Sequence, residues 1–298
     1  LKLKNNNVSH IINTILSYHD EPFLSSDCIY QFLLRKQISN NGYKVLLVGE
    51  GGDELLGGYK RLLYPFLYSL KKDKRESEYI HALNGSVEFM GMSSNSVLKG
   101  LDNYNNIINN SLIGQENISA YKILNKKFIN QNQAQINKSF YPNSNHKNLF
   151  IAHLKQHLTQ RHVPYILRME DRNSMAFNIE TRVPFLDHRL IEFAFSHDYA
   201  EFMKGGINKS LLRRTMKDDL PSEVTNRFSK SPRPGNNSHI VYKILYKEML
   251  NILKNDKLYD LGFLKNGITE KFIDDKNVND NNSAEIWFRI YNLYKWCS

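Results

Sequence analysis

Residues 44–59 read KVLLVGEGGDELLGGY, and this stretch decides the fold. An apolar segment rich in β-branched residues runs directly into glycines that carry three carboxylates, those of Glu50, Asp53 and Glu54. The pattern is typical of a buried parallel strand that delivers acidic side chains to the carboxyl edge of an α/β sheet, where ligands bind. We therefore predict a strand over residues 43–48, followed by a glycine-rich turn and a helix.

Two of these acids, Glu50 and Asp53, are candidates to hold a metal-bound phosphate. Carboxylates that face a polyanion need a divalent cation between them, and Mg²⁺ is the usual choice. The alternative is a tight strand-to-helix turn with solvated acids, in which Asp53 or Glu54 supplies negative charge to the first turn of the helix. The loop is neither G-x-G-x-x-G nor a Walker A loop, so taken alone it leaves both interpretations open.

The composition is that of a globular protein, with 298 residues, 41% hydrophobic and 23% charged. A formal net charge of +10 suits an anionic partner. The lysines and arginines are spread along the chain, however, and no zinc-finger or RNP-type signature accompanies them. We therefore expect a phosphate-handling pocket and no nucleic-acid partner.

The two cysteines, Cys28 and Cys297, form no disulfide framework and no metal-spaced cluster, which fits a reducing cytoplasm. No apolar stretch has membrane-spanning length, and no signal-peptide pattern is present. The sequence thus predicts a cytoplasmic protein without a membrane partner. Its oligomeric state stays open.

The remaining pattern is mainly helical. We predict helices over residues 10–17 and 28–38, separated by a turn at which Pro22 excludes the preceding residue from helical geometry. Residues 1–62 are expected to form the α/β part, and residues 63–298 a mainly helical remainder. Within that remainder, the asparagine-rich region 86–148 is interpreted as a variable helical insertion, and 229–237 as a loop.

A second block, RMEDRNSMAFNIETRVPFLD at residues 168–187, is dense in paired charges. In a helix, Arg168 and Arg172 share a face, and Val183 and Pro184 would end that helix. By itself the block also fits an ordinary charged helix with weak surface salt bridges.

Taken together, these segments are more specific. The glycine-acid loop, the second block, DEPF at 20–23, INKSLLR at 207–213 and RFSK at 227–230 resemble, in order and spacing, the synthetase domain of glutamine-hydrolysing asparagine synthetases. The resemblance covers roughly residues 18–235. It implies an α/β fold with a partial PP-loop ATPase (adenine nucleotide alpha hydrolase-like) parallel sheet, followed by a mainly helical carboxy-terminal part.

The resemblance also implies a reaction. In this family the side-chain carboxylate of aspartate attacks the α-phosphate of Mg-ATP, which gives β-aspartyl-AMP and pyrophosphate. Ammonia, released from glutamine in a separate amino-terminal glutaminase domain, then displaces AMP. The implied cofactors are ATP and Mg²⁺. The implied partners are aspartate, ammonia from glutamine and the glutaminase domain.

Site residues follow from the matching positions. Glu50 would be the base toward incoming ammonia, and Lys209 the cation that stabilises charge on the phosphates; the alternative for Lys209 is a solvated helix lysine. Asp53 would be the Mg²⁺ ligand. The implied nucleotide contacts are Gly49, Gly51, Gly52, Asp53, Arg227 and Lys230, and the charged helix beside the pocket would supply Asp171, Arg172, Glu180 and Arg182 as functional or structural support.

Three departures from the family pattern matter. Val48 replaces a hydroxyl residue often found before Gly-Glu, which removes one donor worth about 1 kcal/mol. Nothing in the chain matches the family's Ser-Gly-Gly-x-Asp-Ser pyrophosphate loop, and nothing matches the glutaminase domain. We therefore expect a fragment with little activity alone. Two alternatives stay open: a relative that acts on another carboxylate, such as a sugar acid or a ring-closing peptide substrate, and an inactive remnant.

Overall fold

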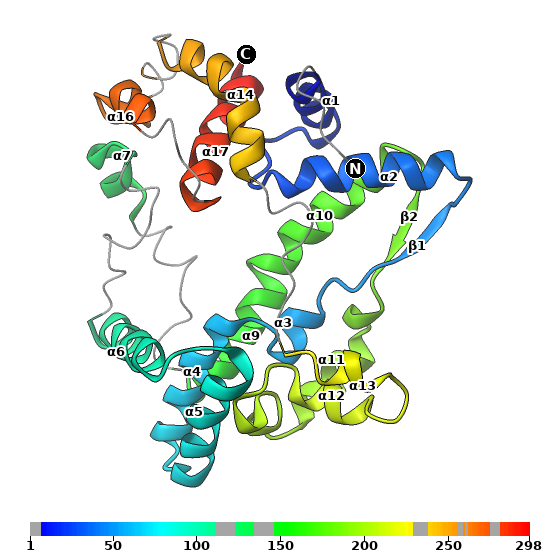
Figure 1. The fold of residues 1–298 in the computed structure, drawn as a ribbon, viewed down its shortest axis with the longest axis vertical. Coiled ribbons are helices and arrows are strands. Elements are labelled where there is room, and N and C mark those ends of the chain that lie inside the picture. The colour runs from blue at the N-terminus through cyan, green and yellow to red at the C-terminus, as the bar shows by residue number, and fades with distance from the viewer. Residues whose placement is uncertain are drawn as a thin grey trace.

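A computed structural model describes residues 7–110, 123–133, 146–228, 238–254, 259, 262–274 and 281–298. Within these residues the strands are β1 (Val45–Leu47) and β2 (Glu180–Arg182), and the other named elements are helices (Figure 1). The α-helices are α1 (Val8–His19), α2 (Asp27–Asn40), α3 (Gly52–Leu56), α4 (Leu63–Lys72), α5 (Glu76–Met90), α6 (Ser94–Asn110), α7 (Lys126–Gln131), α9 (Leu149–Thr159), α10 (His162–Met175), α11 (His188–Ser196), α12 (Ser210–Thr215), α13 (Ser222–Thr225), α14 (Ser238–Leu253), α16 (Ile268–Asp274) and α17 (Asn281–Cys297). The 3₁₀ helices are η1 (Lys60–Leu62), η4 (Pro184–Leu186), η5 (Tyr199–Glu201) and η6 (Lys204–Gly206).

The sheet pairs two segments that are far apart in the sequence. β1 and β2 are parallel, and Val45 lies opposite Glu180 while Leu47 lies opposite Arg182. The prediction of a parallel strand is confirmed. The prediction that this strand is buried is wrong, because Val45 is 50% exposed and Leu47 is 68% exposed. In the described part of the chain no helix covers either residue enough to bury it, and Figure 1 shows the strands running along the outside of the helical body.

β2 is a second correction. Glu180 and Arg182 were expected on the charged helix, but that helix, α10, ends at Met175. Asn178 then adopts the left-handed conformation (φ 54°), which turns the chain out of the helix and into β2. The sheet therefore draws one strand from each of the two expected regions, 1–62 and 63–298.

One hydrophobic core joins the two ends of the described chain. Helices α1 and α2 pack with α14, α16 and α17, around buried residues that include Ile12, Ile15 and Trp287. Polar contacts reinforce this packing, because the Tyr291 hydroxyl donates to Ser9 Oγ (2.9 Å) and Ser9 donates to Glu248 (3.0 Å). The predicted helices at 10–17 and 28–38 are confirmed, each slightly longer than expected.

A second core lies at the opposite end of the molecule in Figure 1 and supports the glycine-rich turn. It contains Leu55 and Leu56 of α3 together with buried residues of α4, α5, α6 and α9. Backbones approach very closely here: a Cβ added to Gly85 would lie 1.7 Å from the carbonyl oxygen of Gly205. Glycine at position 85 is what allows η6 to pack on α5.

Helix α10 links the two ends, and its buried acid is Glu170. The Glu170 carboxylate pairs with Arg35 of α2, whose Nε donates to Glu170 Oε1 (2.9 Å), and both side chains are almost fully buried. On the other side of α10, Arg168 pairs with Glu21 and Arg172 with Asp20 (3.3 Å). The prediction that the two arginines share a face is confirmed, because both contact the turn after α1.

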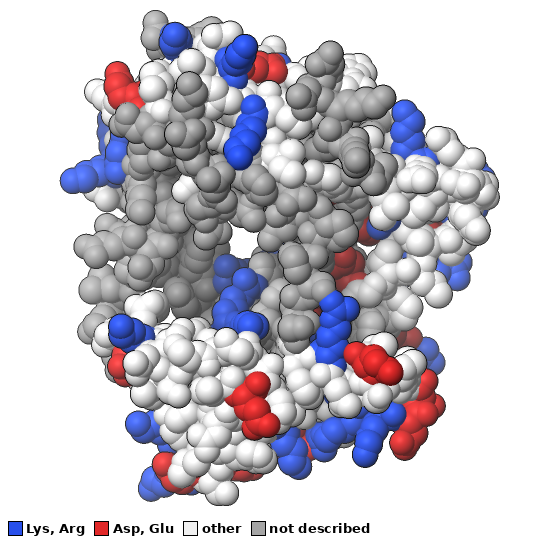
Figure 2. Space-filling view, viewed as in Figure 1, with Lys and Arg blue, Asp and Glu red and all other residues white. Residues whose placement is uncertain are grey.

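In the described residues no helix combines the length and the apolar character needed to cross a membrane. Figure 2 shows lysine and arginine side chains interleaved with acidic ones over one face of the molecule. This distribution agrees with the dispersed charge of the sequence.

Candidate active site

The turn after β1 is built around glycines that tolerate close contact. Gly51 has φ of 89°, and a Cβ added to it would lie 2.3 Å from Leu186 Cδ2. Gly52 lies against the ring of Phe185. The apolar residues of η4 therefore pack directly onto the turn, and the turn directs the chain into α3, whose first turn contains Asp53 and Glu54.

Asp53 and Lys209 meet at the start of α3. Lys209 Nζ lies 2.7 Å from Asp53 Oδ1, and the two side chains are 29% and 18% exposed respectively. The pair lies against Gly58, where an added Cβ would be 1.9 Å from Asp53 Oδ1 and 2.6 Å from Lys209 Cε. The structure thus brings together two charged groups for which the family resemblance implies roles at the phosphates.

The backbone around Lys209 is strained and firmly held. Lys209 has φ of 53° and ψ of 32°, a left-handed conformation that non-glycine residues seldom adopt, and it precedes α12. Its neighbour Asn208 donates to the Gly58 carbonyl (3.1 Å), and Arg213 donates to the Asn208 carbonyl (2.9 Å). These bonds tie the lysine segment to the turn that carries Asp53.

The three acids of the turn have different surroundings. Glu54 is 1% exposed and accepts a hydrogen bond from the Tyr59 hydroxyl. Burial, together with that carboxylate, raises the pKa of Tyr59, so the phenol remains a donor at neutral pH. Glu50 is only partly buried on the turn itself. Glu54 is therefore structural, and Glu50 remains the candidate base.

The other predicted site residues lie on other elements or outside the described residues. Asp171 is exposed on α10, and Glu180 and Arg182 form an exposed pair with each other (3.0 Å) on β2. The Arg227 side chain is exposed, and its carbonyl accepts from Arg213 (3.0 Å). Lys230 lies outside the described residues.

Asp53 suits the role of a magnesium ligand. The described residues contain no group of three or more His, Cys, Asp or Glu side chains placed to hold a metal ion on their own. Mg²⁺ is typically held by one or two carboxylates together with substrate phosphates, so a single partly exposed carboxylate beside an ammonium fits a metal that arrives with a nucleotide. Asp53 would hold that ion, which would neutralise phosphate charge.

Sequence reasoning missed the residues that fix this arrangement. Asn208 and Arg213 are part of the INKSLLR segment, but their bonds to backbone carbonyls carry no sequence signature. Tyr59 had a usable signal, because an aromatic residue five positions after a buried acid can place its hydroxyl on that acid across a tight turn. The signal is weak without coordinates.

The fold is of the PP-loop ATPase type, with a small parallel sheet and a mostly helical remainder. A sequence profile of asparagine synthase matches residues 1–298, and the chain belongs to the asparagine synthase family. Similar proteins include three glutamine-hydrolysing asparagine synthetases of Bacillus subtilis (strain 168). Number 1 is 28% identical over 72% of this chain, number 2 is 27% identical over 70%, and number 3 is 34% identical over 31%.

The chain spans only part of each of those relatives. It covers 34% of the length of synthetase 1, 24% of synthetase 2 and 15% of synthetase 3. The chain is therefore a member of the family, but the activity of the full-length relatives does not follow from that membership.

Proposed function

We propose that the chain is the synthetase part of an ATP-dependent, AMP-forming amide ligase. The observation that carries the proposal is the Asp53–Lys209 contact of 2.7 Å at the carboxyl end of β1. The strained backbone at Lys209 supports it further, since strain of this kind concentrates at functional sites. A surface salt bridge would need neither the strain nor the glycine at position 58.

The proposed reaction has two steps. A substrate carboxylate oxygen attacks the α-phosphorus of ATP, the bond from that phosphorus to the bridging oxygen breaks, and pyrophosphate leaves. Ammonia then attacks the acyl carbon, AMP leaves with the carboxylate oxygen, and a base takes the proton lost by nitrogen. Lys209 would stabilise the negative charge that builds on the phosphates, and Glu50 would accept the proton.

Aspartate is the proposed carboxylate and glutamine-derived ammonia the proposed nitrogen source. The similar Bacillus subtilis proteins are named glutamine-hydrolysing asparagine synthetases, which supports asparagine as the product and glutamine as the nitrogen source. The apolar residues of β1 are exposed, whereas parallel sheets normally have both faces covered by other segments. We therefore propose that full activity requires further polypeptide against β1.

Exchange of labelled pyrophosphate into ATP tests the first step. With aspartate present, the full natural protein should catalyse exchange, and the 298-residue chain should do so weakly. In the full protein, Lys209→Ala should reduce exchange by about 10²-fold or more, since a positioned transition-state charge contributes on that scale. Lys204→Ala, an exposed lysine paired with Glu201 (3.0 Å), is the matched control and should leave exchange unchanged.

Two outcomes would contradict the proposal. Full exchange by Lys209→Ala would remove the lysine from the phosphates, and exchange that is independent of any added carboxylate would remove the ligase chemistry. A panel of other carboxylates in the same assay distinguishes aspartate from a different acceptor.

A further inference from the structure

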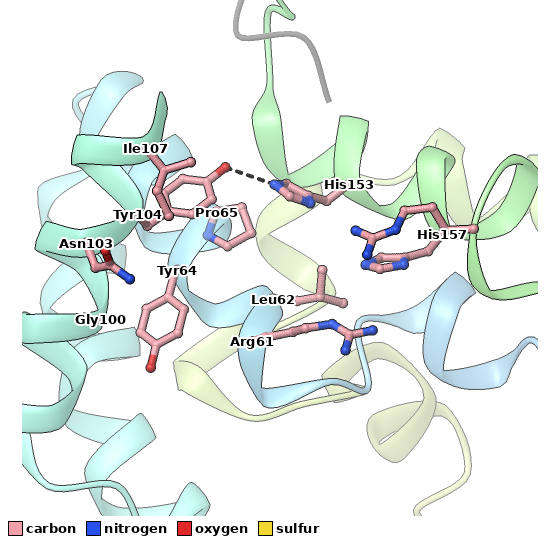
Figure 3. A pocket seen from close by; sticks show the side chains of 11 residues that line it. Arg61, Leu62, Tyr64, Pro65, Gly100, Asn103, Tyr104, Ile107, His153 and His157 are labelled. Atoms are coloured by element: carbon pink, nitrogen blue, oxygen red, sulfur yellow. Dashed lines mark hydrogen bonds between the residues drawn. The ribbon is translucent and has the colours of Figure 1, made fainter. Parts of the chain in front are cut away.

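A separate cavity lies beside the nucleotide turn and shares none of its candidate catalytic residues. It has a volume of about 410 Å³ and opens between η1, α4, α6 and α9. Figure 3 shows Arg61 and His157 on one side, Tyr104 and Asn103 on the other, and Leu62 and Pro65 between them. Nothing in the proposed ligase chemistry uses this space.

The charge lining the cavity is positive. Two guanidiniums, those of Arg61 and Arg161, line it, and the described part of the chain contributes no Asp or Glu to the lining. Arg61 is exposed, stacks on the Tyr59 ring (4.5 Å) and donates to Nε2 of His162. The nearby carboxylates of Glu54 and Asp53 attract Arg61 from outside the cavity. Guanidiniums with this access bind carboxylates and phosphates well.

Imidazoles add donors of fixed geometry. His153 and His157 lie one turn apart on α9, and His157 stacks on His162 with ring centroids 4.7 Å apart. Burial, with the positive charge of Arg61 and Arg161 as a smaller cause, lowers the pKa of His153 to about 3 and of His157 to about 2. Both rings are therefore neutral at pH 7 and each keeps one N–H donor.

His157 has an unused polar atom. Its side chain is 1% exposed, and its Nδ1 has no hydrogen-bond partner among the described residues. Buried polar atoms are nearly always partnered, so such an atom in a cavity wall points to a ligand or an ordered water. The described residues offer no metal-ligating group of three here, which makes a metal cation a poor occupant.

The cavity is too large and too apolar for a bare inorganic ion. Leu62, Pro65 and Ile107 supply aliphatic wall, and the Tyr64 and Tyr104 rings supply aromatic wall. Sites of a few hundred Å³ with mixed walls suit organic ligands that present a charged group on an apolar body.

We propose that this cavity binds a small organic anion, in which a carboxylate or a phosphate monoester is held by the guanidiniums of Arg61 and Arg161 and the apolar body packs on the aliphatic and aromatic walls. Guanidiniums bind carboxylates and phosphates in the same way, and calorimetry with one probe of each kind distinguishes the two. The site is distinct from that of ATP, because Asp53 and Lys209 lie outside its lining.

Isothermal titration calorimetry with four probes tests this site on the 298-residue chain. Benzoate and phenyl phosphate carry the two anionic groups, benzamide is the neutral counterpart of benzoate, and inorganic phosphate lacks the apolar body. At constant ionic strength, benzoate or phenyl phosphate should bind at least about tenfold more tightly than benzamide and inorganic phosphate. The tighter of the two identifies the preferred anion.

Variants locate the binding. Arg161→Gln should weaken binding of the anions by about tenfold or more, since a charge-assisted bond is lost. Asn103→Asp adds one negative charge to an exposed lining residue and nearly keeps its shape, so the variant should fold normally. It should bind the anions more weakly and benzamide equally well. Arg189→Gln, an exposed arginine paired with Asp187 on α11, and Lys209→Ala should both leave binding unchanged.

Four results would overturn the proposal. Three are equal binding of benzoate and benzamide, unchanged anion binding by Asn103→Asp, and no binding of any probe up to about 10 mM, a concentration at which even weak specific sites are filled. The fourth is loss of binding in Lys209→Ala, because the anion would then occupy the proposed nucleotide site. None of these readouts depends on ligase activity.

Discussion

Lys209 holds a backbone conformation that costs a lysine about 1–3 kcal/mol relative to an ordinary one. The surrounding bonds from Asn208 and Arg213 maintain it, and its effect is to bring the ammonium onto Asp53. Glycine would adopt this positive φ at no steric cost, so the lysine carries backbone strain that a glycine would not.

Because of this strain, we predict that glycine at position 209 is less destabilising than alanine, the reverse of the usual order. Lys209→Gly and Lys209→Ala both remove the ammonium, so both should lose pyrophosphate exchange. The glycine variant should nevertheless be more stable than the alanine variant by about 1 kcal/mol, since only alanine retains the left-handed strain. Urea denaturation of the two proteins measures the difference, and a more stable alanine variant would show that position 209 is not strained.

Some residues of the site could be predicted from the sequence and others could not. Asp53 and Lys209, which the structure brings into contact, were named together because each lies in a segment that resembles a motif of the family. The neighbours Glu170 and Asp171 are equivalent in sequence, yet Glu170 is buried against Arg35 and Asp171 is exposed. Which of two adjacent acids faces inward depends on how α10 is rotated against α2, and local sequence does not contain that rotation.

Among the elements, β2 shows why short strands escape prediction. Its three residues, Glu-Thr-Arg, give too little alternation to separate a strand from the end of a charged helix. β1 was predicted from its apolar β-branched run, and that run also predicted burial on both faces. The exposure of Val45 and Leu47 therefore depends on which other segments pack against the strand. The residues of the strand do not determine that packing.

The histidines of α9 and the start of α10 make stability depend on pH. Burial is the main cause that lowers the pKa of His153 to about 3, of His157 to about 2 and of His162 to about 4. Below about pH 6.5 these residues take up protons in the unfolded chain but not in the folded one. The free energy of unfolding should therefore fall as the pH drops from about 6.5 toward 4.5, by up to about 1.4 kcal/mol per pH unit for each fully buried histidine.

A single substitution isolates the effect. His153→Gln keeps an acceptor for the Tyr104 hydroxyl, which lies 3.0 Å from His153 Nε2, and removes one titrating group. Its unfolding free energy, measured by urea titration between about pH 6.5 and 4.5, should decline less steeply than that of the natural chain by about 1 kcal/mol per unit. His188→Gln, whose side chain is 81% exposed, should keep the natural slope. Equal slopes for all three proteins would mean that His153 titrates normally.

At the scale of the whole molecule, the described residues build two large hydrophobic cores that share no buried residue, and a small third cluster of Tyr104, Ile108 and Leu149. The first gathers both ends of the described chain, and the second carries the glycine-rich turn after β1 and lies beside the cavity. Helix α10 and the sheet connect them (Figure 1). The family resemblance was enough to predict the α/β part and the helical remainder, but it could not show that α1 packs on α17, because that contact joins the two ends of the described chain and leaves no local pattern.

The two cores should respond separately when a buried side chain in one of them is truncated. Ile12 of α1 is fully buried in the first core, so Ile12→Ala should destabilise that core by about 2–5 kcal/mol. Because local opening follows the packing of each unit, amide hydrogen exchange should accelerate in α14 and α17 and stay unchanged in α4 of the second core. Ile80→Ala, at a position that is 49% exposed, is the control and should change neither region. Equal acceleration in α4 and α17 would show that α10 couples the cores into one cooperative unit, and in that case binding at the cavity would also report on events at the joined ends of the chain.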